Sequence, residues 1–358
     1  MQFIKRTSYH DELRLFPDRQ TLWQYLVLFA VLLLLPLAAD GYILSQATFV
    51  FIYGIVAMGM MLLVGYTGQI SLGHAAFFAV GAYVAAVLQA RGWSFLPAFA
   101  AAGALSGIVG IVIGLPALRV KGVYLAMATL SFAFIVEEVI VRWSSVTRGN
   151  RGMKVVDPEI FGFKFGTPVH IYYLSGVVFW LVVLVIVHVL RSRTGRALSA
   201  LRDSDVAAES MGINLAQFKT TAFALSAVAT GLAGALYAHK LAYISPEQFG
   251  ITVSVEFLMM IIIGGLGSLH GAVFGAMFFI LLPQLIVGLK NFLPARIAEL
   301  PVLESVTFGL MVILFVMFEP RGLNGYWVRI KTYLALFPFY RQGMFKRNKL
   351  AASDLIKH

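Results

Sequence analysis

Long apolar stretches, separated by short polar segments, dominate the pattern of the chain. Two of them, Gly41 to Ala90 and Phe257 to Leu289, contain no Asp, Glu, Lys or Arg. Each is longer than the roughly 20 apolar residues that cross a bilayer as one helix. Each also holds a glycine cluster near its middle. Because backbone breaks at membrane depth occur where protein buries them or a cavity runs past them, each stretch predicts two spans joined at a break.

The length rule places about ten transmembrane helices along the chain, some of them broken or short. The eighth is short enough to be a half-helix. The expected fold is therefore all-α, a polytopic helical membrane protein. It divides into an N-terminal segment 1–20, a transmembrane domain 21–320 with a polar segment 193–214, and a basic tail 321–358. The ten helices are expected near 24–39, 47–64, 73–90, 97–115, 123–141, 171–190, 217–238, 255–263, 272–290 and 302–318.

Composition agrees with this pattern and excludes other classes. Hydrophobic residues make up 59% of the 358 positions and charged residues 13%, against roughly 25% charged in soluble domains. This excludes an ordinary soluble enzyme and a disordered protein. The continuous apolar runs do not fit the alternating strands of a membrane β-barrel. The chain has no cysteine, so disulfides and thiolate metal sites are excluded.

The net charge of +11 indicates orientation and not nucleic-acid binding. An even number of helices places both termini on one side. With the termini in the cytoplasm, most of the basic residues lie on the cytoplasmic side, as the positive-inside rule requires. The loop 142–164, which holds five basic residues, is the exception and would face outward.

The first motif is the break GYTGQISLGH between the second and third predicted spans. Broken helices beside a solute path recur in transporters, and polar edges here could contact a solute. The alternative is close helix packing, which small residues permit. We interpret the histidine of this motif as a hydrogen-bonded structural residue and not as a proton carrier. The candidates in this break are Gly65, Gly68, Gln69, Ser71, Gly73 and His74.

A second motif, GGLGSLHG, joins the eighth and ninth spans. It resembles the first in glycine density and in a Ser-Leu pair followed by His, which is weak support for a repeat. Because the two motifs are six spans apart, both turns are expected on the same face of the membrane. Neither matches the phosphate-binding pattern of a P-loop. Its candidates are Gly264, Gly265, Gly267 and Ser268.

The third motif is the polar segment 193–214, on the basic side. Residues 205–211 are expected to form a short helix that ends at Gly212 in a left-handed cap. Asn214 then caps the next helix, with Gln217 three residues on. The alternatives are a solvated loop and a docking element for a soluble partner. We favour docking, because two capped helices with small residues suit insertion into a cleft.

The remaining patterns have structural interpretations. The Gly-x-x-x-Gly pairs at 103/107, 110/114 and 271/275 are expected to be close helix contacts. The acidic residues that we single out near span positions are Glu137, Glu138 and Glu256, each close to a span end. An ion relay is therefore weakly supported. We find no nucleophile–base pair or metal-ligand cluster, so we expect neither an enzyme nor a cofactor.

Four segments together resemble the LivM-type permease of branched-chain amino-acid ABC importers. They are GYTGQISLGHAAFFAVGAY at 65–83, LRVKGVYLAMATL at 118–130, the segment 193–214, and IIGGLGSLHGAVFG at 262–275. They occur in the family's order, and the resemblance extends from about residue 47 to 320, which makes it more specific than any single glycine cluster.

The resemblance implies a multi-pass permease subunit of the bacterial inner membrane, working by alternating access. Its implied partners are a homologous LivH-type permease, two cytoplasmic ATP-binding subunits and a periplasmic substrate-binding protein. The broader importer pattern reads Glu-Ala-Ala, whereas this chain reads Ala-Ala-Glu. The glycine breaks, with Gly122 and Tyr124 of the second segment, would lie around the solute path between two permeases. The residues implied in coupling to the ATPase are Ala200, Arg202, Asp203, Ala207, Ala208, Glu209 and Gly212.

Other functions remain open at this stage. Related permeases carry urea or short amides, so the substrate is not fixed by the resemblance. An ion-coupled secondary transporter acting alone would need titratable groups deep in the bundle. A scaffolding membrane protein would carry no solute. The basic tail is expected to be attracted to anionic membrane lipid.

Overall fold

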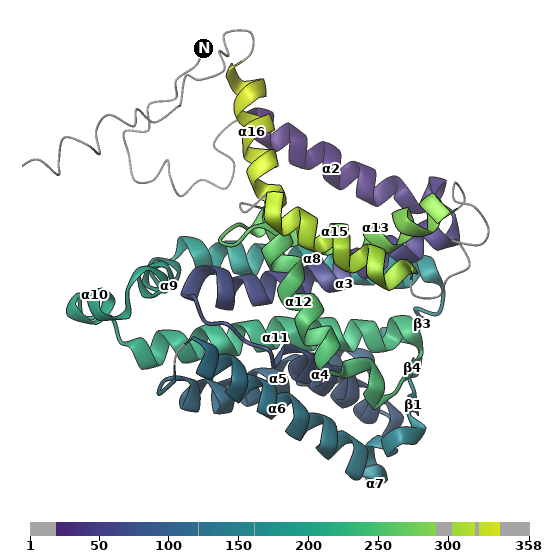
Figure 1. The fold of residues 1–358 in the computed structure, drawn as a ribbon. Helices are drawn as coiled ribbons and strands as arrows, with labels where there is room; N and C mark the ends of the chain where they lie inside the picture. The colour runs from purple at the N-terminus through teal and green to yellow at the C-terminus, as the bar shows by residue number, and fades with distance from the viewer. Residues whose placement is uncertain (1–18, 121, 161, 291–302, 319–321, 337–358) are drawn as a thin grey trace, which may run out of the picture.

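The computed structural model describes residues 19–120, 122–160, 162–290, 303–318 and 322–336. Within these ranges, ten apolar helices follow the ten predicted spans in order, so the helical membrane fold is confirmed (Figure 1). They are α2 (Arg19–Ala38), α3 (Gly41–Met60), α4 (His74–Ala90), α5 (Phe95–Ala117), α6 (Val123–Arg142), α8 (Pro168–Arg191), α11 (Leu215–Leu241), α12 (Ile251–Gly264), α13 (Leu269–Lys290) and α15 (Leu303–Phe318).

The lengths of the spans depart from expectation at two places. A π-helical turn, η1 (Met61–Gly65), extends α3 without a gap, so that this span reaches the first glycine break. Helix α12 is short, as expected, but the 3-10 turn η3 (Pro246–Phe249) precedes it directly. Together they make a span of 19 residues. The expected half-helix, α12, is therefore the C-terminal part of a full-length span.

Connecting segments gather at two opposite ends of the bundle (Figure 1). One end carries α9 (Arg193–Asp203) and α10 (Asp205–Ser210). The other carries α7 (Ser144–Thr147), η2 (Gly149–Arg151) and two small antiparallel pairings. In these, β1 (Met153–Lys154) pairs with β4 (Tyr243–Ile244), and β2 (Glu159–Ile160) pairs with β3 (Phe163–Lys164). The first pairing ties the segment after α6 to the turn after α11.

Helix α11 runs through the middle of the bundle and packs against α3, α4 and α5. The contact with α5 is made at the glycines of its two Gly-x-x-x-Gly pairs. Side-chain or backbone atoms of α11 lie close to each of these four glycines. A β-carbon at Gly107 would lie 2.5 Å from Val228, and one at Gly110 would lie 2.5 Å from Ala227. Such approach is possible only without a side chain. The expectation that these pairs are close helix contacts is confirmed.

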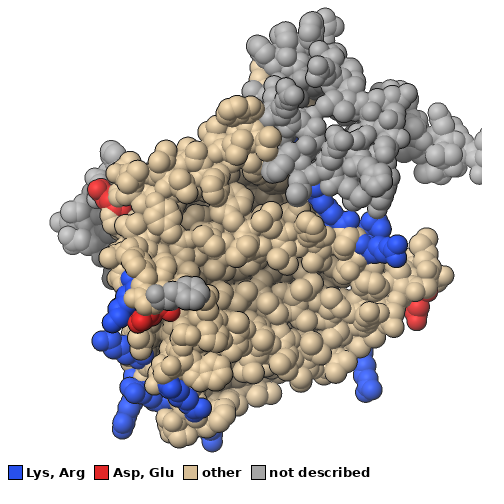
Figure 2. Space-filling model, turned by 180° about the vertical axis from the view of Figure 1, so that it is seen from behind, with Lys and Arg blue, Asp and Glu red and all other residues tan. Residues whose placement is uncertain are grey.

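Charged side chains avoid the middle of the molecule. Figure 2 shows Lys, Arg, Asp and Glu gathered toward the two ends, with a broad belt of other residues between them. Large apolar side chains are exposed within the spans, for example Ile108, Val112 and Leu184. An exposed apolar belt between two charged ends is the surface that a bilayer requires.

Part of the predicted basic tail is a helix that the sequence patterns did not indicate. Helix α16 (Gly322–Leu336) begins against the second glycine break, where a β-carbon at Gly322 would lie 2.5 Å from the backbone nitrogen of Gly265. Trp327 packs edge-on against Phe274 of α13, with ring centroids 5.6 Å apart. The remainder of the tail and residues 1–18 lie outside the described residues.

Candidate functional site

The first glycine break links η1 to α4 through a non-helical segment at residues 68–73. Leu72 donates its backbone N–H to Thr129 Oγ1 of α6 at 3.0 Å. A β-carbon at Gly73 would lie 2.6 Å from the Thr129 carbonyl oxygen. Gln69 is buried, and its amide atoms have no hydrogen-bond partner among the described residues. The break is therefore partly buried: Gln69, Ser71 and Gly73 are inside the protein, at a close approach to α6, whereas Gly68 and Ile70 are exposed.

His74 begins α4 and is fully buried. Its two ring nitrogens lie 3.0 Å from Ser71 Oγ and 2.7 Å from Ser226 Oγ of α11. The next residue, Ala75, donates its backbone N–H to Ser254 Oγ of α12 at 2.9 Å. Both ring nitrogens of His74 therefore have protein partners, as expected of a hydrogen-bonded structural residue.

The second break, between α12 and α13, is a backbone-to-backbone contact. A β-carbon at Gly264 would lie 2.0 Å from the carbonyl oxygen of Gly271, and one at Gly275 would lie 1.8 Å from that of Met260. Gly265 ends α12 with φ +104°, a conformation that side chains rarely adopt. Only glycine permits this approach and this turn.

The two breaks lie against each other, as expected if both turns share a face. The Gly267 backbone N–H points to Met61 Sδ at 3.2 Å. A β-carbon at Gly65 would lie 3.0 Å from the Gly267 nitrogen. The two breaks are therefore in direct contact.

Arg202 of α9 lies beside both breaks. A β-carbon at Gly68 would lie 3.9 Å from Arg202 Cα and Cγ, and one at Gly267 would lie 2.7 Å from Arg202 Nη1. The stem of Arg202 thus passes the first break, and its guanidinium reaches the second. Arg202 is thus the coupling candidate that the structure places close to a glycine of each break.

The polar segment 193–214 folds as the sequence predicts. Ser204 accepts from the Ala207 N–H and caps α10, and Asn214 accepts from the Gln217 N–H and caps α11. Gly212 follows α10 with φ +81°. An ion pair that we did not predict fixes the segment to α11, because Lys219 Nζ lies 2.8 Å from Asp205 Oδ2 with both side chains largely buried.

The coupling candidates divide by exposure. Ala208 is fully buried and packs with Leu62, Leu198 and Phe223 in a cluster beneath α10. It is not on the free surface of the chain, so only part of the expected small-residue face is accessible. The exposed candidates are Arg202, Asp203, Ala207, Glu209 and Gly212, and Ala200 is half-buried. Two apolar side chains that we did not select are among the most exposed here, Val206 at 72% and Met211 at 82%.

A cavity of about 340 Å³ lies where the first break, the segment after α5 and α9–α10 meet. Thr67, Leu125 and Lys219 also line it. Tyr124, in contrast, is 74% exposed on α6 and lies outside this group. The candidate residues that line the cavity are Gly68, Gln69, Gly122, Arg202 and Asp203.

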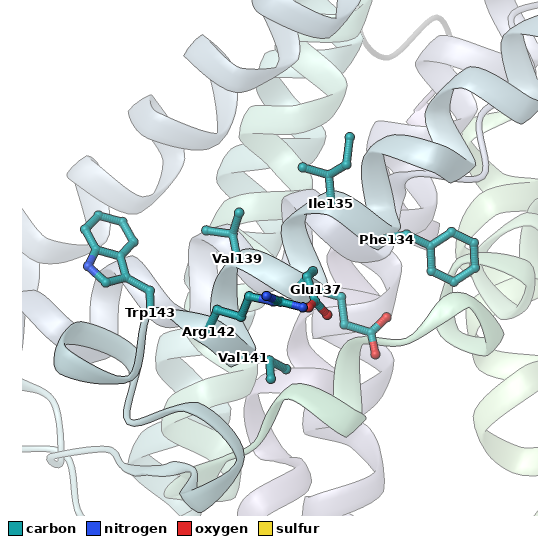
Figure 3. Close-up of a pocket in the computed structure, with 8 residues that line it drawn as sticks. Phe134, Ile135, Glu137, Val139, Val141, Arg142 and Trp143 are labelled. Carbon is teal, nitrogen blue, oxygen red and sulfur yellow. The ribbon is translucent and has the colours of Figure 1, made fainter.

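A wider hollow of about 820 Å³ lies at the other end of α6. Figure 3 shows that its lining comes from one stretch of chain, which includes Phe134, Glu137, Arg142 and Trp143. Arg142 pairs with Glu138 one turn earlier. None of the candidate site residues lines this hollow, and we assign it no role.

Comparison with known proteins decides the family. The family model described as branched-chain amino acid transport system / permease component matches residues 42–317. The chain belongs to this permease family. It is 30% identical over 334 residues to the high-affinity branched-chain amino acid transport system permease protein LivM of Salmonella typhimurium, covering 86% of this chain and 76% of the relative.

Other members extend the comparison. LivM of Escherichia coli K12 matches this permease with the same identity and coverage. LivH of the same organism is 23% identical over 297 residues, which cover 76% of this chain and 91% of LivH. No solved structure matches the permease. The chain is thus a multi-pass membrane permease, related to both LivM and LivH.

Proposed function

We propose that this permease is one of two membrane subunits of an ATP-driven ABC importer that carries branched-chain amino acids across the bacterial inner membrane. The observation that carries the proposal is the contact of Arg202 with both glycine breaks, which connects the polar end of the bundle to the places where the spans are interrupted. The chain itself performs no covalent chemistry. Energy comes from two ATP-binding subunits on the cytoplasmic side.

Alternating access follows from this connection. When the ATP-binding subunits close on ATP, they move α9 and α10, and the Lys219–Asp205 ion pair holds α10 to α11. The breaks shift together because they are in contact with each other and with Arg202. Packed interfaces rearrange in discrete steps, so the bundle switches between two states and does not deform gradually.

The partners follow from the orientation. With both termini in the cytoplasm, α9 and α10 face the ATP-binding subunits, and the segment 143–167 faces a periplasmic substrate-binding protein. A homologous LivH-type permease completes the solute path. The basic tail contacts anionic lipid. The relatives named for branched-chain amino acid transport support the substrate class.

Uptake by the reconstituted transporter tests the proposal. The permease, a LivH-type subunit and the ATP-binding subunits are placed in liposomes with the binding protein, and uptake of leucine, isoleucine, valine, acetamide and urea is measured with and without ATP. We expect ATP-dependent uptake of the branched-chain amino acids. Preferential uptake of urea or acetamide would contradict the substrate. Uptake by the permease alone, driven by an ion gradient, would contradict the mechanism.

We expect Met211→Glu to weaken binding of the ATP-binding subunits by about tenfold, because it places a carboxylate in a desolvated apolar contact. Met211 is the better test position because Ala208, in the same segment, is buried inside the chain. Co-purification of the ATP-binding subunits measures the effect. The matched control is Asn150→Glu, an exposed site at the opposite end. Equal co-purification of both variants and the wild type would contradict the docking role of α10.

A further inference from the structure

Two tyrosines are the partly exposed residues of otherwise buried helix segments. From Phe51 to Gly65, every residue is buried except Tyr53. From Ala233 to His239 on α11, every residue is buried except Tyr237. The centroids of the two rings lie 6.2 Å apart. The aromatic cluster between α3 and α11 is therefore partly exposed at these two tyrosines, and both side chains are polar at the tip.

Three buried rings pack beneath the two tyrosines and are called the floor residues. Phe78 of α4 lies 5.0 Å from the Tyr237 ring, and Phe257 of α12 lies 5.8 Å from the Tyr53 ring. Phe249 of η3 lies 6.1 Å from Tyr237. These three floor residues are almost entirely buried. They support the rings of Tyr53 and Tyr237, and these partly exposed rings are the surface that an aliphatic side chain could cover.

Two charged side chains of opposite sign stand at the rim. Lys240, one turn beyond Tyr237, places its ammonium 5.6 Å from the ring centre of Phe49, which lies one turn before Tyr53. Glu256 of α12 directly precedes Phe257, whose ring lies 5.8 Å from the ring of Tyr53. Both side chains are half-buried. Neither belongs to a salt bridge within the part of the chain that the structure describes.

Unpaired charges in this position need a reason. Ionisable side chains within membrane spans are costly, and they mark substrate or ion paths when they face a cavity or a protein interface. A purely structural aromatic cluster would be completed by apolar residues. Here the rim instead offers one ammonium, one carboxylate and two hydroxyl groups around an aromatic floor. This set is complementary to a zwitterion that carries an apolar side chain.

We infer that Phe49, Tyr53, Tyr237, Lys240 and Glu256 form a binding site for a zwitterionic α-amino acid on the solute path. Glu256 accepts hydrogen bonds from the substrate ammonium, and Lys240 donates to its carboxylate. The aliphatic side chain lies against the partly exposed rings of Tyr53 and Tyr237, which the floor residues support. The inference rests on the proposed function, in which the second permease closes the open side of the site.

Position along the spans agrees with this role. Lys240 is next to the last residue of α11, and Glu256 is in the second turn of α12, whereas Tyr53 lies near the middle of the α3–η1 span. The site therefore extends from the end that carries β1 and β4 toward the bundle centre. A solute that enters at this end meets the charged rim before it reaches the glycine breaks at the other end.

Photolabelling of the complete transporter tests the site. A leucine analogue with a diazirine in its side chain is added to the assembled transporter in liposomes, irradiated, and mapped by mass spectrometry. We expect label on α3, α11 and α12 near the floor residues, and we expect excess leucine to remove it. In Glu256→Gln and Lys240→Gln, labelling and leucine uptake should both fall by about tenfold, because a charge-assisted hydrogen bond to substrate is lost.

The matched control is Glu138→Gln, an exposed carboxylate of α6 that pairs with Arg142. Uptake by this variant should stay within about twofold of the wild type, because exposed pairs contribute little. Labelling elsewhere, with leucine uptake intact in the wild type, overturns the site and leaves the proposed function standing. Wild-type uptake rates in both Glu256→Gln and Lys240→Gln also overturn it. If the wild-type transporter carries no amino acid at all, the proposed function fails together with the site.

Discussion

Gly264→Ala is expected to reduce the amount of assembled permease in the membrane by about tenfold, because the added methyl group has no space and overpacking of helix contacts is costly. A β-carbon at this position would lie 2.0 Å from the Gly271 carbonyl oxygen and 3.2 Å from the Gly275 nitrogen. Both atoms are backbone, so no side chain can move aside. To accept alanine, α12 and α13 must separate. Size-exclusion chromatography of the tagged permease from equal amounts of membrane measures the effect.

Gly309→Ala provides the matched control. Gly309 is also a helical glycine in an apolar span, but no atom lies within 4 Å of the position that its β-carbon would take. Alanine there should leave the yield unchanged or raise it, since alanine favours helix over glycine by about 1 kcal/mol. Equal yields of both variants and the wild type would contradict the tight contact between α12 and α13.

The sequence could predict where the spans break, because that depends on length and local composition. The uncharged stretches are too long for single helices, and the glycine clusters mark their interruption. The sequence could not predict that the Gly267 N–H meets Met61, because this contact forms only when α3 and the turn before α13 come together. The position of a glycine break can be predicted from the local sequence, whereas the residues that contact the break are set by tertiary packing.

The same division holds for the coupling segment. The caps by Ser204 and Asn214 are local, and Asn214 is read from its position before an apolar run. The burial of the Ala208 side chain cannot be predicted from the local sequence, because it depends on how α10 packs on the bundle. Tyr53 and Tyr237 lie among apolar residues without a distinct period, so no sequence pattern separates them from core aromatics. Helix α16 was missed because the glycines Gly322 and Gly325 interrupt its start.

Arg202→Ala is expected to lower uptake by about tenfold while ATP hydrolysis continues, which is the result that loss of a coupling contact predicts. In the wild type, the Arg202 stem passes Gly68 and its guanidinium reaches Gly267. Alanine keeps helix α9 but removes this contact, so a movement of α9 and α10 no longer reaches the second break directly. The measurement is the ratio of substrate transported to ATP hydrolysed, in liposomes that contain the complete transporter.

Two further variants separate coupling from general damage. Arg91→Ala removes an exposed arginine at the opposite end of the bundle, after α4, and should leave the ratio unchanged. Arg202→Lys keeps an extended stem beside Gly68 but lacks the planar guanidinium, and it should give a ratio between those of the alanine variant and the wild type. If Arg202→Ala transports with the wild-type ratio, the two breaks receive their movement by another route, and the contact of Arg202 with Gly267 is only packing.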